Sequence, residues 1–142
     1  MNTIITYGTF DLLHIGHVNL LRRARALGDR LIVGLSTDEF NQEMKNKTSV
    51  VSYDDRQLML ESLRFVDMVI PETNWEQKPF DIQNFGVKKF VIGNDWQGHF
   101  DSLNEYCEVV YLPRTENVST THIKQVVQSL DSGNVVKLHV SA

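Results

Sequence analysis

Two histidines three residues apart, His14 and His17, are the side chains of this sequence best suited to chemistry. They follow the apolar, β-type segment 3–7 and precede a stretch with helical periodicity, so they are expected where a strand leads into a helix. A helix N-terminus attracts anions, because its free N–H groups and the positive end of its dipole point outward. The i, i+3 spacing directs both imidazoles to one side, and Gly16 between them lets a ligand approach the backbone. This pattern predicts a site that binds a polyphosphate and stabilises charge during its chemistry.

A cluster of hydroxyls, Ser119, Thr120 and Thr121, opens the last segment with helical periodicity. Residues of these types are ordinary N-caps, and a helix start with spare hydroxyls is also an anion site, so the two interpretations are compatible. Upstream, Arg114 carries a planar fork of donors that suits phosphate, although a surface arginine is the simpler alternative. We expect the histidine pair and this late cluster to converge on one bound triphosphate.

The size and composition of the chain limit the classes of function. A chain of 142 residues, 42% hydrophobic and 23% charged, fits one soluble domain with a proper core. A net charge of −4 gives no general attraction to nucleic acid or to an anionic membrane. The sequence shows neither an apolar run of membrane-spanning length nor a signal-peptide pattern, so we expect a cytoplasmic protein without membrane insertion. Its single cysteine, Cys107, excludes an internal disulfide and is expected to be a buried thiol.

Short apolar, β-branched runs alternate along the chain with segments of helical periodicity. Residues 17–27 and 54–64 are predicted to be helices, the second with Asp54 as its N-cap. A further helix is predicted to begin at Ser119 or Thr120. The predicted strands are residues 3–7, 30–36, 66–70, 88–93 and 108–112.

This alternation predicts an α/β fold: a Rossmann-like, doubly wound parallel sheet of about five strands with helices on both faces. We expect a single domain, residues 1–130, followed by a tail of unknown role, residues 131–142. In such sheets, ligands bind at the carboxyl ends of the strands, which is where the histidine motif follows the first strand.

The histidine motif, residues 14–17, resembles the HxGH signature of the cytidylyltransferase-type nucleotidyltransferases, and Gly-Thr-Phe-Asp at residues 8–11 precedes it. The resemblance runs from about residue 3 to about residue 128. Four further segments are similar to those of the glycerol-3-phosphate cytidylyltransferases within this family. They are residues 36–41, 64–67, 74–78 and 114–121.

The resemblance implies an enzyme that converts CTP and sn-glycerol 3-phosphate to CDP-glycerol and diphosphate by direct in-line attack at the α-phosphorus. It also implies a homodimer, Mg²⁺ carried with CTP, and a product used for teichoic acid or capsular polymer. Two alternatives stay open. The same chemistry could use another acceptor, such as a polyol or ethanolamine phosphate, or the chain could be a non-catalytic, nucleotide-binding regulatory subunit.

The resemblance assigns roles to individual residues as well. His14, His17 and Arg114 are the expected catalytic groups, and Lys78 is an expected contact to the acceptor, with an exposed surface lysine as the alternative. The remaining expected nucleotide contacts are Thr9, Phe10, Asp11, Ile15, Gly16, Lys47, Asp95, Thr115, Ser119, Thr120 and Thr121.

Two lysines, Lys45 and Lys47, lie in the polar segment 41–52, which is expected to form a mobile lid over the substrates. The resemblance assigns Lys45 to glycerol phosphate and Lys47 to CTP. This chain is one residue longer than the family pattern between Asn41 and Tyr53, which leaves the reverse assignment open.

Several acidic residues are given supporting roles. Asp11 and Asp38 are expected to organise loops rather than to act as bases. Asp95, which follows a predicted strand, is expected to border the cytidine pocket and to accept from a base amino group. Arg64 and Asp67, between a predicted helix and a predicted strand, could form a structural ion pair or a dimer contact, or touch substrate; a structural role at the subunit interface is favoured.

Overall fold

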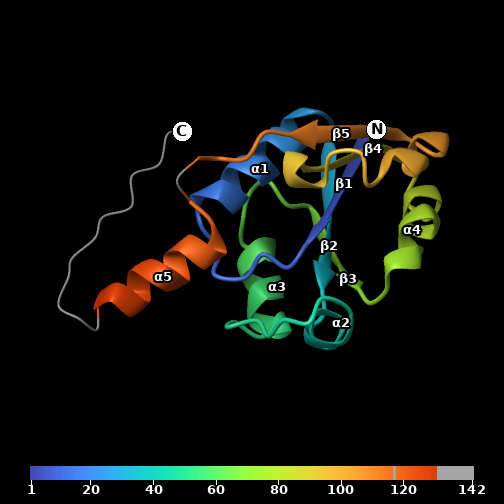
Figure 1. Ribbon diagram of the computed structural model, residues 1–142. Coiled ribbons are helices and arrows are strands. Elements are labelled where there is room, and N and C mark those ends of the chain that lie inside the picture. The colour runs from blue at the N-terminus through green and yellow to red at the C-terminus, as the bar shows by residue number, and fades with distance from the viewer. Residues whose placement is uncertain (117, 131–142) are drawn as a thin grey trace.

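Five parallel strands form the sheet at the centre of the fold (Figure 1). The computed structural model describes residues 1–116 and 118–130, and the predicted tail lies outside the described residues. The strands are β1 (Thr3–Gly8), β2 (Arg30–Ser36), β3 (Met68–Glu72), β4 (Val87–Gly93) and β5 (Glu108–Leu112). Their order, β3-β2-β1-β4-β5 with every pairing parallel, confirms the doubly wound, Rossmann-like sheet predicted from the sequence.

Helices connect the strands of the described chain. The α-helices are α1 (Ile15–Ala26), α2 (Asp38–Met44), α3 (Tyr53–Glu61), α4 (Lys78–Asn84) and α5 (Thr120–Leu130). Three short 3-10 helices are η1 (Trp75–Gln77), η2 (Asn94–Trp96) and η3 (Asp101–Glu105). None of the helices in the described ranges has the length and apolarity that crossing a membrane requires.

The helix boundaries differ from the predicted ones in ways that have local causes. The first helix begins at Ile15 because His14 acts as its N-cap. The N-cap of α3 is Ser52, so the prediction of Asp54 in that role is wrong. Two helices, α2 and α4, were not predicted, because seven residues are too few to show a helical period against the background of polar positions.

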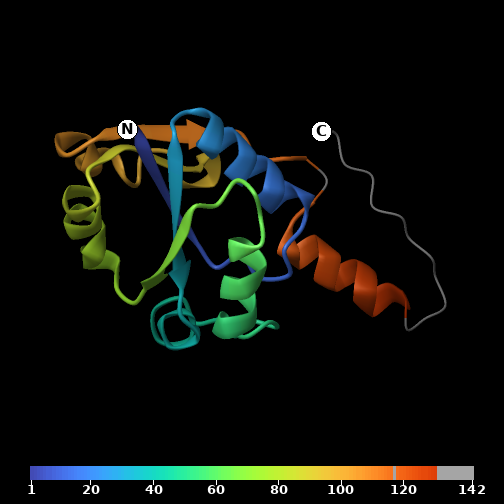
Figure 2. The same ribbon diagram turned by 180° about the vertical axis from the view of Figure 1, so that it is seen from behind.

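The two faces of the sheet bury separate apolar clusters, because successive side chains of a strand point to opposite faces. On one face, Ile4 of β1 packs with Leu21 of α1 and with Leu60 of α3. On the other, Ile5 packs with Ile82 of α4 and with residues of η3. Figures 1 and 2, which view the molecule from opposite sides, show α1 and α3 on one side of the sheet and α4 on the other. Both faces are therefore covered, as a parallel sheet requires.

The chain changes direction between the two central strands. From β1 it passes to α1 on one face, whereas from β4 it passes through η2 to η3 on the opposite face. A crevice at the carboxyl ends of two such strands is the usual ligand site of this kind of sheet. The fold therefore positions the histidine motif, which follows β1, next to the residues that follow β4.

Candidate active site

The two histidines cap the first helix through their own side chains. Nδ1 of His14 accepts a hydrogen bond from the backbone N–H of Gly16 at 3.0 Å. Nδ1 of His17 accepts one from the backbone N–H of His14 at 3.2 Å, which completes a reciprocal capping box. Because both Nδ1 atoms accept, the proton of each neutral ring lies on Nε2. Each histidine therefore keeps one N–H donor for a ligand while its ring is held in place.

Burial and mutual contact keep both imidazoles neutral. Their rings stack with centroids 3.7 Å apart, so a charge on one disfavours a charge on the other. Burial lowers the pKa of His17 to about 3, an effect that His14 adds to and Asp11 opposes. Burial likewise lowers the pKa of His14, with a smaller contribution from Arg114. At neutral pH the pair thus offers two uncharged donors, and the positive charge of the site comes from lysines and arginines.

The lowered pKa of His17 predicts a loss of stability in mild acid. Below the ordinary value of 6.5 this histidine binds a proton in the unfolded chain, but in the folded protein it does so only near pH 3. The unfolded state binds more protons in this window, so the free energy of unfolding falls as the pH falls, by up to about 1.4 kcal/mol per pH unit. Urea unfolding between neutral pH and about pH 5 should show a steeper decline for the wild type than for His17→Gln. Parallel declines would contradict the prediction.

Gly16 is required by the histidine pair itself. A Cβ at this position would lie 2.8 Å from Cε1 of His14 and 3.2 Å from Cγ1 of Val118. The space that the sequence interpretation reserved for a ligand is therefore partly filled by the His14 ring. On the other side, Phe10, which has a φ of 50°, packs its ring edge against His17 at a centroid distance of 5.3 Å.

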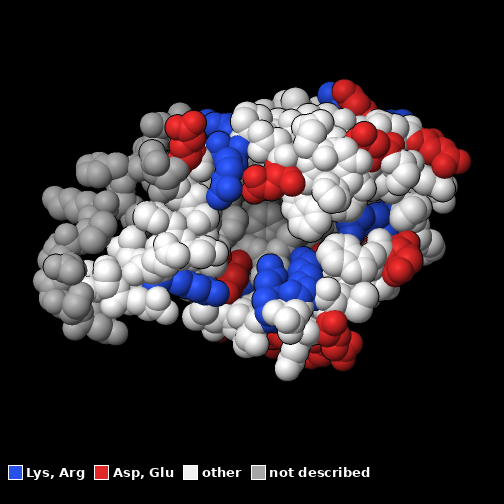
Figure 3. Space-filling model, viewed as in Figure 1, with Lys and Arg blue, Asp and Glu red and all other residues white. Residues whose placement is uncertain are grey.

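A cavity of about 460 Å³ opens beside the histidine pair. The start of α5 lines it too, so the structure brings together the two anion-binding patterns as predicted. Figure 3 shows Lys and Arg side chains gathered around a hollow on this face of the molecule. The predicted nucleotide contacts in the cavity wall are Thr9, Phe10, Asp11, His14, Gly16, His17, Lys47, Asp95, Arg114, Thr115, Ser119, Thr120 and Thr121.

Ile15 is the predicted nucleotide contact that the structure does not bring into this cavity. It occupies the first position of α1 and is 43% exposed. The helical spacing that directs His14 and His17 to one side turns the residue between them away. The contact of Ile15 with the nucleotide therefore stays a prediction.

Arg114 lies at the rim of the cavity, where its side chain is 55% exposed. Its Nη1 is 3.6 Å from a carboxylate oxygen of Asp95, which follows β4. An exposed pair at this distance contributes little to stability. A phosphate can therefore take the place of Asp95 as the partner of this guanidinium at small energetic cost.

The hydroxyls at the start of α5 join two parts of the site. The Thr120 hydroxyl donates to the backbone carbonyl of Asp11 at 2.9 Å. The Ser119 hydroxyl accepts from the N–H of His122 at 3.0 Å, which is an N-cap interaction. Thr121 is exposed and lines the cavity. The first N–H groups of a helix need partners from outside the helix, so this end of α5 remains suited to an anion.

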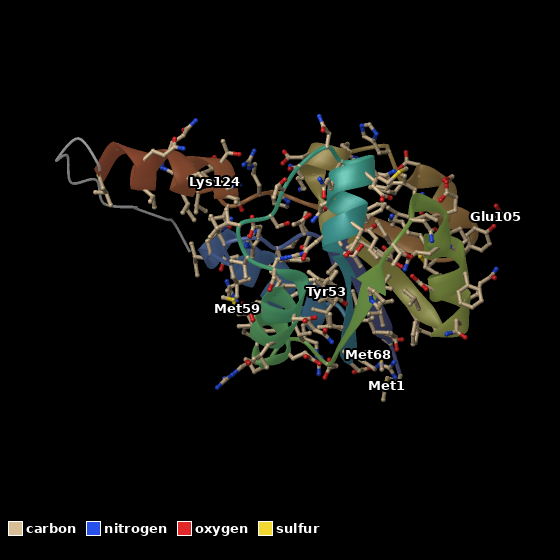
Figure 4. All side chains as sticks on the ribbon, turned by 90° about the horizontal axis from the view of Figure 1, so that it is seen from below. Met1, Tyr53, Met59, Met68, Glu105 and Lys124 are labelled. Carbon is tan, nitrogen blue, oxygen red and sulfur yellow. The ribbon has the colours of Figure 1, made fainter. Side chains whose placement is uncertain are left out.

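Lys124 is a cavity residue that sequence reasoning missed. It lies on α5 one turn beyond Thr120, at the end of the helix nearest the sheet (Figure 4). Residues at i and i+4 share one face of a helix, so the position of Thr120 would have indicated Lys124. Arg23 of α1 reaches the same wall and donates to the carbonyl of Pro113 at 3.2 Å.

The segment between α2 and α3 is anchored at several points in this structure, and its action as a mobile lid stays a prediction. The Asp11 carboxylate accepts from two consecutive backbone N–H groups of this segment, at 2.8 and 2.9 Å. Arg56, which is 1% exposed, donates to the carbonyl of Val51 at 2.9 Å and to Asp38 at 2.6 Å. Asp11 and Asp38 therefore organise this loop, as predicted. The polar composition did not reveal the anchors because both come from other parts of the chain.

A smaller cavity of about 140 Å³ adjoins the first. Lys45 and Lys78 line the smaller cavity, whereas Lys47 lines both. The assignment of the two loop lysines to separate substrates stays a prediction. Lys78 is only 3% exposed, so the alternative of an exposed surface lysine is wrong. The residues common to the two walls are Tyr7, Gly8, Thr9, Lys47, Ile92 and Trp96.

Arg64 and Asp67, from the segment 64–67 that resembles the family, lie outside both cavities. Asp67 accepts from Nε of Arg25 at 3.1 Å and from the N–H of Leu31 at 2.7 Å, so it fastens α1 to the start of β2. Arg64 is exposed. Asp67 therefore forms an ion pair with Arg25 within the chain, while a role of Arg64 and Asp67 at a subunit interface stays a prediction.

The acidic groups around the large cavity are already engaged. Both carboxylate oxygens of Asp11 accept backbone hydrogen bonds, and Asp95 faces Arg114. Among residues 1–116 and 118–130, no group of three or more His, Cys, Asp or Glu is placed to hold a metal ion. This donor set fits a magnesium ion that is coordinated mainly by substrate phosphates and water.

Known proteins resemble this chain in sequence and in fold. The chain matches the family model described as cytidylyltransferase-like over residues 5–126. It is 58% identical over 132 residues to glycerol-3-phosphate cytidylyltransferase of Staphylococcus aureus, covering 93% of this chain and 99% of that protein. Identity to the Bacillus spizizenii protein of the same name is 60% over 130 residues, with 92% and 100% covered. The lipopolysaccharide core biosynthesis protein from Thermoplasma volcanium has a similar fold, with a TM-score of 0.67 at 21% identity over 80% of this chain and 98% of that one. The chain therefore belongs to the cytidylyltransferase family of nucleotidyltransferases, and within it to the glycerol-3-phosphate cytidylyltransferases.

Proposed function

We propose that this protein is a glycerol-3-phosphate cytidylyltransferase that forms CDP-glycerol and diphosphate from CTP and sn-glycerol 3-phosphate. The observation that carries the proposal is the wall shared by the two cavities. The larger cavity has the histidine pair and the start of α5, which suit a nucleoside triphosphate. The smaller cavity has lysines, which suit a single phosphate. Substrates on the two sides of Thr9 and Lys47 meet at this wall. The high identity to curated enzymes of this name, over almost their whole length, supports the same acceptor.

The proposed reaction is a single in-line displacement. A phosphate oxygen of glycerol 3-phosphate forms a bond to the α-phosphorus of CTP, while the bond from that phosphorus to the oxygen bridging to the β-phosphorus breaks. Diphosphate leaves with the electron pair. The Nε2–H groups of His14 and His17 stabilise the charge that develops around the α-phosphoryl group, and Arg114 and Lys124 hold the departing diphosphate. Positioning of two reactants in one site lowers such a barrier by about 7–11 kcal/mol.

The charge distribution suits two anionic substrates on an acidic protein. The net charge of the chain is −4, yet Lys47, Arg114 and Lys124 line the larger cavity and Lys45 and Lys78 the smaller one. Attraction is therefore confined to the crevice. The protein is thereby expected to bind phosphorylated small molecules without a general affinity for nucleic acid.

The reaction is further proposed to involve a metal ion, a contact to the base and a second copy of the chain. Magnesium arrives with CTP, and Asp95 accepts from the amino group of the cytosine ring. The enzyme works in the cytoplasm as a homodimer. Its product serves as an activated donor of glycerol phosphate for teichoic acid or capsular polymer.

The experiment that tests the proposed function is a panel of acceptors. Purified protein is mixed with CTP, magnesium and one phosphate at a time, including sn-glycerol 3-phosphate, polyol phosphates and ethanolamine phosphate, and diphosphate release is measured. We expect release with sn-glycerol 3-phosphate and formation of CDP-glycerol. Preference for another acceptor would mean that this acceptor, and not sn-glycerol 3-phosphate, is the substrate. No release with any acceptor would favour a non-catalytic nucleotide-binding protein.

Lys45→Ala is expected to weaken the use of glycerol 3-phosphate and to leave CTP binding nearly unchanged. Loss of one charge-assisted hydrogen bond to the acceptor phosphate should raise its KM about 10- to 100-fold. Initial rates with each substrate varied in turn measure the two KM values separately. An equal rise in the KM for CTP would show that the two loop lysines are assigned in the wrong order.

A further inference from the structure

A buried carboxylate lies in the wall of the smaller cavity, where repulsion from a phosphate would be expected to exclude one. Glu72, the last residue of β3, is 1% exposed. Its Oε2 accepts from Nζ of Lys78 at 2.8 Å, and its Oε1 is 3.7 Å from Nζ of Lys45. The Ser36 hydroxyl donates to Oε1 at 2.6 Å and accepts from Nζ of Lys45 at 2.9 Å. One carboxylate therefore contacts two ammonium groups, one of them directly and one with the help of a hydroxyl.

Four separate elements contribute the polar groups of this arrangement. The parallel register of β2 and β3 pairs Ser36 with Glu72. Lys78 comes from the first position of α4, and Lys45 caps the end of α2. The ring of Trp75 lies between them, 5.6 Å from Nζ of Lys45 and 5.0 Å from Nζ of Lys78. Each ammonium is thus placed by a carboxylate or hydroxyl partner and by an aromatic face.

Burial makes a counter-charge necessary for these lysines. A buried ammonium without an anionic partner loses its proton or moves to solvent. Burial lowers the pKa of Lys45 to about 8, and Glu72 is the main group that opposes this shift. The Nζ of Lys78 has three N–H donors, one of which is used by Glu72, so donors remain for an incoming phosphate.

We infer that Glu72 is a positioning residue for the acceptor: it holds the ammonium groups of Lys45 and Lys78 in the wall of the smaller cavity, where they bind the acceptor phosphate. This inference rests on the proposed function for the identity of the acceptor. The other titratable or charged groups facing the cluster are Lys47, from the loop after α2, and Tyr7 of β1, whose hydroxyl donates to Asp81 of α4. None of these replaces Glu72, because Lys47 has the same charge as the lysines and Asp81 is occupied by Tyr7.

The test is Glu72→Gln, which keeps the size of the side chain and an acceptor for the Ser36 hydroxyl but removes the charge. At about pH 8, we expect the KM for sn-glycerol 3-phosphate to rise at least about tenfold, while the KM for CTP and kcat change less than about twofold. The KM for the acceptor should also begin to rise at a lower pH than in the wild type, by about one unit or more, because Lys45 loses its proton earlier without the carboxylate. Glu72→Asp, which retains the charge, should recover most of the wild-type pH profile.

The matched control is Glu76→Gln, the same change at an exposed position of η1 outside both cavities. It should leave both KM values and the pH profile unchanged. The inference is overturned if Glu72→Gln keeps a wild-type KM for the acceptor at about pH 8, or if both KM values rise together with an unchanged pH profile. If Glu72→Gln does not fold, the same split between the two KM values is measured for Ser36→Ala, which removes the bridging hydroxyl alone; an unaltered acceptor KM there also overturns it.

The design separates failure of this inference from failure of the proposed function. Diphosphate release by the wild type with sn-glycerol 3-phosphate tests the function before any variant is made. Calorimetric titration of sn-glycerol 3-phosphate into wild type and Glu72→Gln, each in the presence of CTP and without magnesium, tests the role of Glu72 whether or not turnover occurs. Equal affinities would refute the role of Glu72, and at least about tenfold weaker binding to the variant would support it.

Discussion

Replacing His17 with alanine is expected to lower kcat at least about 100-fold, because it removes one preorganised donor from the charge that develops at the α-phosphorus. Nδ1 of His17 is fixed by the backbone N–H of His14, so its Nε2–H has a defined direction. Steady-state kinetics at saturating CTP and glycerol 3-phosphate measure the loss.

The matched control for this variant is His122→Ala. His122 is exposed on α5 and lies outside both cavities, so its replacement should leave kcat within about twofold of the wild type. Near-normal turnover of His17→Ala would remove this imidazole from the mechanism. If the variant also has a lower melting temperature, an assay well below that temperature separates a loss of catalysis from a loss of folded protein.

Arg56→Ala should lower the free energy of unfolding by about 3–5 kcal/mol, the largest stability effect expected for an arginine in the described chain. The guanidinium is 1% exposed and donates to the carbonyls of Thr9 and Ser36 at 2.8 and 2.9 Å, in addition to the loop carbonyl and Asp38. Its removal leaves buried carbonyls without partners and frees the loop that carries the lysines. Urea unfolding at neutral pH measures the change.

Arg22→Ala is the control for the loss of an arginine as such. Arg22 is exposed on α1 and makes one hydrogen bond, to Asn19 at 3.2 Å, so its replacement should change the free energy of unfolding by less than about 0.5 kcal/mol. If Arg56→Ala were equally mild, the Asp11 contacts and the other hydrogen bonds of the loop, such as that from Asn41 to Ser49, would hold it. Because these contacts would then suffice, the anchoring role given to Arg56 would have to be withdrawn.

The central strands and the histidine motif could be predicted from the sequence because their signals are local. The strand beginning at Arg30 is a run of apolar residues that needs two covered faces, and it is found as β2 with all but its first residue buried. His14, His17 and the Ser119–Thr121 cluster could be identified because each stands at the start of a helix. That they line one cavity follows from the order of the strands.

Other features could not be predicted because they depend on partners far away in the chain. Glu72 is an ordinary polar residue in sequence, and only the pairing of β2 with β3 brings it to Ser36. Arg56 stands among polar residues in the sequence of α3, yet it donates to the carbonyls of Thr9, just after β1, and of Ser36, at the end of β2. The burial of Lys78 likewise depends on Tyr7 of β1 and on Phe100, the residue before η3, whose rings flank its ammonium group.

The wall shared by the two cavities limits how the acceptor preference of this enzyme could be redesigned. Thr9 and Lys47 line both cavities, so a change there that admits a new alcohol phosphate is expected to alter the binding of CTP as well. Trp75 and Phe100 line only the smaller cavity. A mutant library confined to these two positions is therefore expected to change the choice of acceptor while nucleotide recognition is left intact.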